Sequence, residues 1–148
     1  MSLDVKRPEG RRDRLEMANR IIEAIASCGR RFLSMNSDRL NPEPGARVSR
    51  FELVNGRLWY VDKWRESRIF VHYECRSRHG WGWRFSEGGT LLCLLQHLRD
   101  FITKGVPINP GHFGPFQQWS CGGDPWGYGA DMAVLRAKVD AILQERKT

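Results

Sequence analysis

The feature of this 148-residue sequence that most constrains its fold is an Asn-Gly pair between two runs of β-favouring residues. Asn55 and Gly56 separate residues 51–54 from residues 57–61, and both runs are rich in aromatic and branched side chains. A two-residue turn of this kind needs positive φ at both positions, which Asn and Gly tolerate best. The sequence therefore predicts an antiparallel β-hairpin whose register is fixed by its turn.

The hairpin register divides the side chains between two faces. Phe51 opposite Tyr60 and Leu53 opposite Leu58 form an apolar face, which we expect to lie on the core. The other face mixes charged and aromatic side chains, and it comprises Arg50, Glu52, Arg57, Trp59, Val61 and Lys63. Because Trp59 lies opposite Glu52 on this second face, we expect its ring to be exposed.

Helical spacing of apolar residues predicts three helices, at about residues 13–27, 90–104 and 131–146. Gly105 is expected to end the second helix. Further strands are expected at residues 30–33, 68–74 and 81–85. The predicted fold class is α+β: an antiparallel β-meander of three to five strands, with three helices packed mainly on one face. Residues 1–12 are expected to form a flexible basic arm, and residues 13–148 a single α+β domain.

Composition excludes several broad classes of protein. A hydrophobic content of 41% is too high for wholesale disorder. No apolar run approaches the roughly 20 residues of a membrane helix, and the charged N-terminus lacks the apolar block of a signal peptide. Four cysteines are too few for a disulfide scaffold. We therefore expect a cytoplasmic protein with reduced thiols and no membrane partner.

The net charge of +7 is concentrated in the middle of the chain. Residues 30–84 contain 12 basic and 6 acidic side chains, whereas residues 85–148 contain 6 of each. Arginine outnumbers lysine by 19 to 5. Codon usage in a GC-rich genome is one explanation of this excess of arginine. Codon usage does not explain the clustering, which favours a polyanion or an acidic protein surface as the partner.

Three segments resemble a group of small accessory proteins encoded by bacteriophages, plasmids and related mobile elements. They are residues 29–32, residues 85–91, and the segment FGPFQQWSCGGDPWGYG at residues 113–129, which is the most specific of the three. The similarity spans about residues 15–140. The resemblance implies a small accessory protein in the cytoplasm of a bacterial host. It carries no catalytic or binding residue over to this chain.

The candidate binding residues are the tryptophans together with the arginines and the lysine around them. Aromatic rings stack on unpaired bases while cations follow the phosphates, and the same residue types form protein–protein hot spots. Alternatively, the tryptophans fill the core and the arginines solvate its rim. The candidates are Arg50, Arg57, Trp59, Lys63, Trp64, Arg65, Arg68, Trp81, Trp83, Arg84, Trp119 and Trp126. The aromatic loop at residues 113–128 is either a binding lobe or, as we favour, a cover for apolar surface.

Two Cys/His pairs of equal spacing are weak candidates for a zinc site: Cys75 with His79, and Cys93 with His97. Their spacing matches no common zinc finger or ribbon, so the alternative is an ordinary thiol with scattered histidines. Two further pairs have the residue types of a nucleophile and its base, but the sequence does not fix their geometry. They are Cys121 with His112, and His112 with Asp124. The glycines at 88–89 precede a helix, but without the lysine of a phosphate-binding loop.

These patterns together predict a protein that acts by binding, with no catalytic centre and no required cofactor. The first hypothesis is an inhibitor of bacterial nucleic-acid defence machinery, of the anti-CRISPR or antirestriction type, which docks a basic aromatic face on its target complex. The alternative is a module that binds DNA or RNA directly. A second alternative is a small zinc-containing enzyme.

Overall fold

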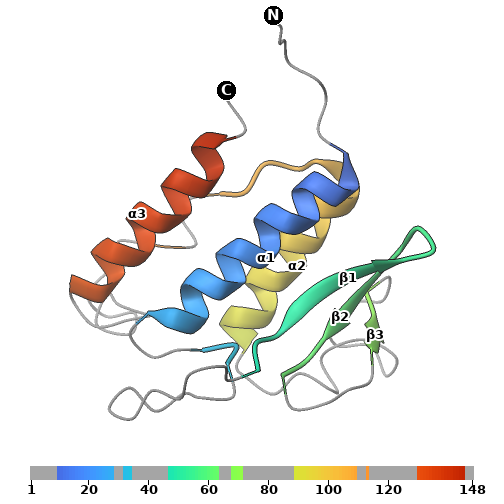
Figure 1. Cartoon of the computed structure of the whole chain (residues 1–148), viewed down its shortest axis with the longest axis horizontal. Coiled ribbons are helices and arrows are strands. Elements are labelled where there is room, and N and C mark those ends of the chain that lie inside the picture. Colours follow the sequence, from blue (N-terminus) through green and yellow to red (C-terminus); the bar gives the residue numbers. More distant parts are fainter. Residues whose placement is uncertain are drawn as a thin grey trace, which may run out of the picture.

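The computed structural model describes residues 10–28, 32–34, 47–63, 68–71, 89–109, 113 and 130–145. These residues form three helices and one sheet, so the predicted α+β class is confirmed (Figure 1). The elements in chain order are α1 (Arg11–Ser27), β1 (Arg50–Val54), β2 (Arg57–Val61), β3 (Arg68–Phe70), α2 (Gly89–Lys104) and α3 (Ala130–Gln144).

The sheet is an antiparallel meander with strand order β1-β2-β3. Asn55 and Gly56 adopt φ values of 53° and 78°, as the predicted turn requires. The register matches the prediction at every pair, with Phe51 opposite Tyr60 and Glu52 opposite Trp59. The strand expected at residues 81–85 lies outside the described residues.

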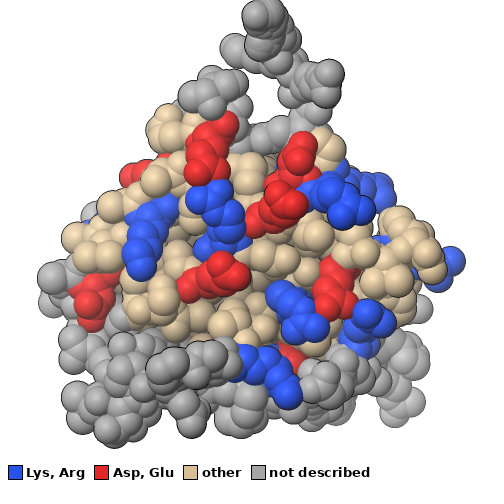
Figure 2. Space-filling view, in the orientation of Figure 1, with Lys and Arg blue, Asp and Glu red and all other residues tan. Residues whose placement is uncertain are grey.

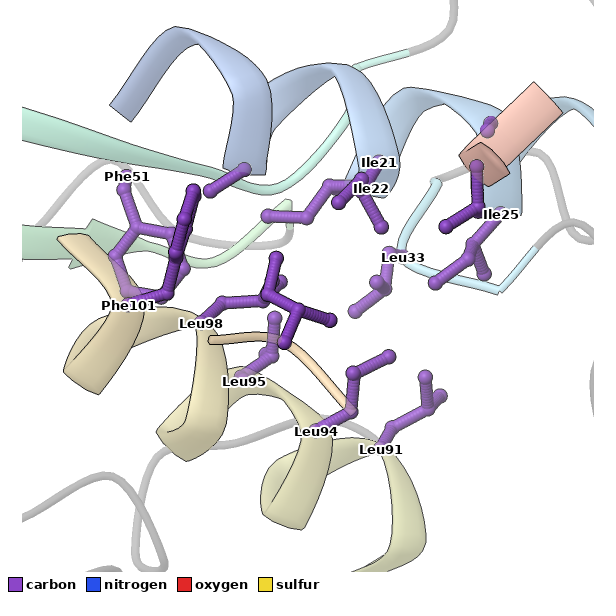
Figure 3. Packing of buried hydrophobic residues seen from close by; sticks show 14 of the residues in the cluster. Ile21, Ile22, Ile25, Leu33, Phe51, Leu91, Leu94, Leu95, Leu98 and Phe101 are labelled. Atoms are coloured by element: carbon purple, nitrogen blue, oxygen red, sulfur yellow. The ribbon is translucent and has the colours of Figure 1, made fainter. Parts of the chain in front are cut away.

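The hydrophobic core lies between the sheet and the helices. Figure 1 shows α1 and α2 on one side of the sheet, and α3 on the far side of α1. The apolar stripe predicted for α2 is buried along its whole length, from Leu91 to Ile102. Figure 3 shows its leucines meeting the isoleucines of α1, with Phe101 beside Phe51 of β1. The helices thus shield one face of the sheet and leave the opposite face away from this core.

Two local expectations were wrong. Phe32 and Leu33 form a turn rather than a strand, and Leu33 has a φ of 67°. Ser34 makes a single bridge to Val48 instead. The third strand ends at Phe70, and Val71 lies in a turn. Residues 72–74 of this expected strand, and residues 30–31 of the other, lie outside the described residues. The first helix begins at Arg11, two residues earlier than predicted, and residues 1–9 of the expected arm lie outside the described residues.

The free edge of β1 is covered by hydrogen bonds from distant parts of the chain. Asn19 of α1 donates its Nδ2 to the carbonyl of Phe51 at 3.0 Å, and its Oδ1 accepts the Phe51 N–H at 2.8 Å. The Ser49 N–H donates to the carbonyl of Leu33 at 2.8 Å. Unpaired strand edges invite pairing with other chains, so these bonds close that edge while holding the sheet against α1.

Candidate binding surface on the sheet

The sheet face opposite α1 and α2 carries the predicted mixture of basic and aromatic side chains; we refer to it as the outer sheet face. The strand register places its members in cross-strand rows. Residues that share a face alternate along each strand. By this alternation, the outer sheet face comprises Arg50, Glu52, Val54, Arg57, Trp59, Val61, Arg68 and Phe70.

An aromatic pair occupies the middle of the outer sheet face. Trp59 and Phe70 are cross-strand neighbours, with ring centroids 4.8 Å apart and an angle of 39° between the ring planes. Both side chains are half-buried, so Trp59 is less exposed than we expected. Such a pair contributes about 0.5–1.5 kcal/mol beyond its buried area. The tilted contact holds the indole in place while leaving part of it accessible to a partner.

Two arginines flank this pair and share one carboxylate. Arg50 donates its Nε to Oε2 of Glu52 at 2.7 Å, and its Nη2 forms an ion pair with the same oxygen, also at 2.7 Å. Arg68 donates its Nε to Oε1 at 2.8 Å. The arginine side chains are 45% and 51% exposed, against 23% for Glu52, so the arginines are the more accessible members of this cluster. Arg57 lies exposed at the turn end of β2.

The two arginines lower the pKa of Glu52 below its ordinary value of 4.5. The hydrogen bond from Arg68 is the largest cause, and burial of the carboxyl opposes it in part. The carboxyl therefore remains ionised at pH values at which a free glutamate would begin to take up a proton. Glu52 holds both guanidinium groups while it offsets part of their positive charge.

The lowered pKa of Glu52 predicts a pH-dependent contribution to stability. The carboxylate stabilises the fold above pH 4.5, and this contribution is lost as the pH falls through the lowered pKa of the folded state. Glu52→Gln is therefore expected to cost about 0.5–1 kcal/mol at pH 7, because both partners are solvent-screened. Urea unfolding of both proteins at pH 7 and pH 3 should show the difference shrinking at pH 3. A difference independent of pH would contradict this assignment.

Lys63 does not belong to the outer sheet face. We expected its side chain to project into solvent, but Lys63 is only 3% exposed. It follows the last residue of β2 by two positions and lies in a turn, where its N–H donates to Oγ of Ser49 at 3.0 Å. Strand alternation no longer governs its direction there. The carbonyl of Lys63 also accepts a bond of 3.5 Å from Arg47.

The structure brings together four of the predicted binding residues, namely Arg50, Arg57, Trp59 and Arg68. The remaining predicted binding residues lie outside the described residues: Trp64, Arg65, Trp81, Trp83, Arg84, Trp119 and Trp126. Sequence reasoning missed Phe70 as a member of this face. Continuing the alternation from Arg68 would have placed Phe70 on the same side as Arg68, and thus beside Trp59.

The candidate zinc ligands are only partly placed by the structure. Cys93 and His97 are both exposed on α2, one turn apart, on the side opposite the leucines. In the described ranges, no three His, Cys, Asp or Glu side chains gather closely enough to hold a metal ion. Cys75 and His79 lie outside these ranges, as do His112, Cys121 and Asp124.

One residue of the aromatic loop is described, and it lies in the core. Phe113 is 2% exposed and packs in the hydrophobic cluster. Its carbonyl accepts a bond of 3.3 Å from Arg136 of α3. At this position the segment acts as a cover for apolar surface. Phe116, Trp119, Trp126 and Tyr128 lie outside the described residues.

A shallow groove of about 510 Å³ lies between α1 and α3, on a different side of the molecule. Its lining includes Arg20, Glu23 and Lys138. Arg20 forms a two-bond ion pair with Glu145, which raises the pKa of Arg20 and lowers that of Glu145. Figure 2 shows basic and acidic side chains interspersed over the helices. The groove therefore presents charges of both signs.

Comparisons with known proteins place the chain in a family. No curated protein and no solved structure matches it significantly. Among the helices described here, none has the length and apolar character required to cross a bilayer. The family described as YoqU matches residues 9–143, which is most of the sequence. On the extent of this match, the chain belongs to the YoqU family.

Proposed function

We propose that this protein is a non-enzymatic binding protein of a mobile genetic element, and that it inhibits bacterial nucleic-acid defence machinery. In this proposal the outer sheet face docks on a defence complex of the CRISPR or restriction type in the bacterial cytoplasm. The observation that carries the proposal is the Trp59–Phe70 pair flanked by Arg50 and Arg68 on the face opposite the helices. The resemblance to mobile-element proteins supports the biological setting.

The chemistry of the outer sheet face favours binding over catalysis. Its described side chains are arginines, aromatic rings, valines and one glutamate. Glu52 already accepts bonds from two arginines, which lower its pKa and leave the carboxylate a weak base. Tryptophan and arginine, by contrast, are over-represented among the residues that dominate binding energy at protein interfaces. The surface is therefore suited to hold a partner rather than to transform a substrate.

Direct binding of DNA or RNA is the second candidate function, and the aromatic pair favours it. A base stacked on an exposed ring gains roughly 1–3 kcal/mol. Here Phe70 already covers part of Trp59, and Glu52 offsets part of the arginine charge. Both features reduce what the face offers to a nucleic acid, so we place docking on a protein complex first.

Trp59→Ala is expected to weaken inhibition about tenfold without unfolding the domain. The test expresses the protein in bacteria with an active CRISPR or restriction system and counts plaques of a targeted phage. Wild-type protein should raise plating efficiency, and Trp59→Ala should lower that gain about tenfold, because truncating a central interface tryptophan costs more than about 1 kcal/mol. Trp59→Phe keeps a ring beside Phe70 and should retain most of the gain.

The same variants separate the two candidate functions. A tagged wild-type protein should retain a defence complex from nuclease-treated lysate, whereas Trp59→Ala should not. Retention that disappears with nuclease would favour the nucleic-acid alternative. Full inhibition by Trp59→Ala would show that the outer sheet face is not the docking surface.

A further inference from the structure

We infer that Glu52 makes the outer sheet face selective for acidic protein segments over the phosphate backbone of nucleic acids. This inference rests on the proposed function and specifies the chemistry of its partner. The recognised segment would place carboxylates on the arginines and an apolar side chain on Trp59. Glu52 would thereby act as a specificity-determining residue.

The first observation behind this inference is the position of Glu52 beside the aromatic pair. Glu52 lies directly opposite Trp59, which in turn lies opposite Phe70, so its carboxylate is in the same cross-strand row as the aromatic pair. Directly opposed residues on one face of an antiparallel pair have Cβ atoms about 4.5–5.5 Å apart. A base stacked on Trp59 would therefore bring its own phosphates close to a fixed negative charge.

The second observation is that Arg50 and Arg68 are both hydrogen-bonded to Glu52. Both Nε donors point to Glu52, at 2.7 Å from Arg50 and 2.8 Å from Arg68. Two guanidinium groups and one carboxylate leave a single net positive charge on this cluster, and exposed Arg57 brings the described outer sheet face to two. Nucleic-acid affinity grows with the number of phosphates that a protein neutralises, and a cluster with one net charge is poorly suited to follow a phosphate chain.

An acidic protein segment needs less positive charge from the outer sheet face than a nucleic acid does. A single carboxylate can pair with the outer edge of one half-exposed guanidinium, since arginine presents five donors in a planar fork. An adjacent apolar side chain can pack on the Trp59–Phe70 pair. The negative charge of Glu52 repels a chain of closely spaced anions. Such repulsion is one way in which an interface rejects the wrong partner.

The test compares two fluorescent probes at low salt: oligothymidylate, and a peptide of otherwise neutral residues that carries one glutamate on each side of a central leucine. Wild-type protein is expected to bind the peptide about tenfold more tightly than the oligonucleotide. Glu52→Gln should bind the oligonucleotide about tenfold more tightly than wild type does. The slope of its log affinity against log salt should steepen by about 0.7, the value for one more phosphate neutralised on a single strand, because more arginine charge becomes available.

Glu145→Gln is the matched control. It changes the net charge by the same amount and releases Arg20 instead, on the α1–α3 side of the molecule. This control should leave both probe affinities unchanged. Equal gains in the two variants, no gain in Glu52→Gln, or a wild-type preference for the oligonucleotide would each overturn the inference. The relative affinity of wild-type protein for the two probes is measured without any variant. It therefore tests the inference even if Glu52→Gln does not fold.

Failure of this inference is distinguishable from failure of the proposed function. If Trp59→Ala loses inhibition while wild-type protein prefers the oligonucleotide, the inference about Glu52 fails and docking through this face stands. If wild-type protein prefers the peptide but gives no gain in plating efficiency, the selectivity is real and the proposed function fails. Full inhibition by Trp59→Ala would instead exclude docking through this face.

Discussion

Replacing Phe51 with alanine is expected to lower the free energy of unfolding by about 3–5 kcal/mol. Phe51 is 1% exposed, and its ring packs edge-on against Tyr60 with the centroids 5.6 Å apart. Figure 3 shows it pointing toward Phe101 of α2, so the side chain joins the sheet to the helices. Truncation removes this contact and leaves a cavity that the surrounding structure fills only in part. For a domain of ordinary stability, about 5–15 kcal/mol, this loss is a large fraction.

Val54→Ala on the same strand provides the control for Phe51. Val54 is half-buried on the outer sheet face, and shortening it should cost less than about 1.5 kcal/mol. Trp59→Ala should also cost far less than Phe51→Ala, since the indole stacks on Phe70 outside the main hydrophobic cluster. Urea unfolding at pH 7, followed by far-ultraviolet circular dichroism, gives all three values. Equal losses would show that the two faces are wrongly assigned.

The parts of the fold that sequence predicted correctly are those specified by neighbouring residues. The turn at Asn55 and Gly56 determines the pairing of β1 with β2, because positive φ is a property of those two residues. The end of α2 is equally local. Gly105 has a φ of 73° there, and its N–H bonds to the carbonyl of Phe101 at 3.0 Å.

The features that sequence reasoning missed depend on contacts between distant residues. Leu33 is fully buried in a turn with positive φ, which its own preferences disfavour, because the core holds it there. Lys63 lies two residues past the end of β2, where a turn rather than strand alternation sets its direction. Of the candidate site, sequence identified Trp59 with three arginines, but the contact of Trp59 with Phe70 needed the β2–β3 register.

Asn19→Leu is expected to lower the free energy of unfolding by about 2–4 kcal/mol. The Asn19 amide accepts the N–H of Phe51 at 2.8 Å and donates to its carbonyl at 3.0 Å, which are the bonds that a neighbouring strand would supply. Leucine has the same branched shape and the same number of heavy atoms but can replace neither bond, and each backbone group left unsatisfied in this part-buried contact costs about 1–3 kcal/mol. The gain in helix propensity is only about 0.5 kcal/mol, so the lost bonds dominate. Thermal and urea unfolding measure the effect.

Asn19→Asp distinguishes the lost hydrogen bonds from a simple packing defect. At pH 7 the carboxylate can still accept the Phe51 N–H, but its second oxygen opposes the carbonyl of Phe51. This repulsion raises the pKa of the introduced carboxyl in the folded state, so the variant is destabilised at neutral pH and recovers below the unfolded-state pKa of about 3.9. Protonation supplies an O–H that can donate to the carbonyl. The stability gap to wild type should therefore narrow from pH 7 to pH 3, while that of Asn19→Leu stays constant. A gap for Asn19→Asp that did not narrow would mean that α1 is held to β1 by packing alone.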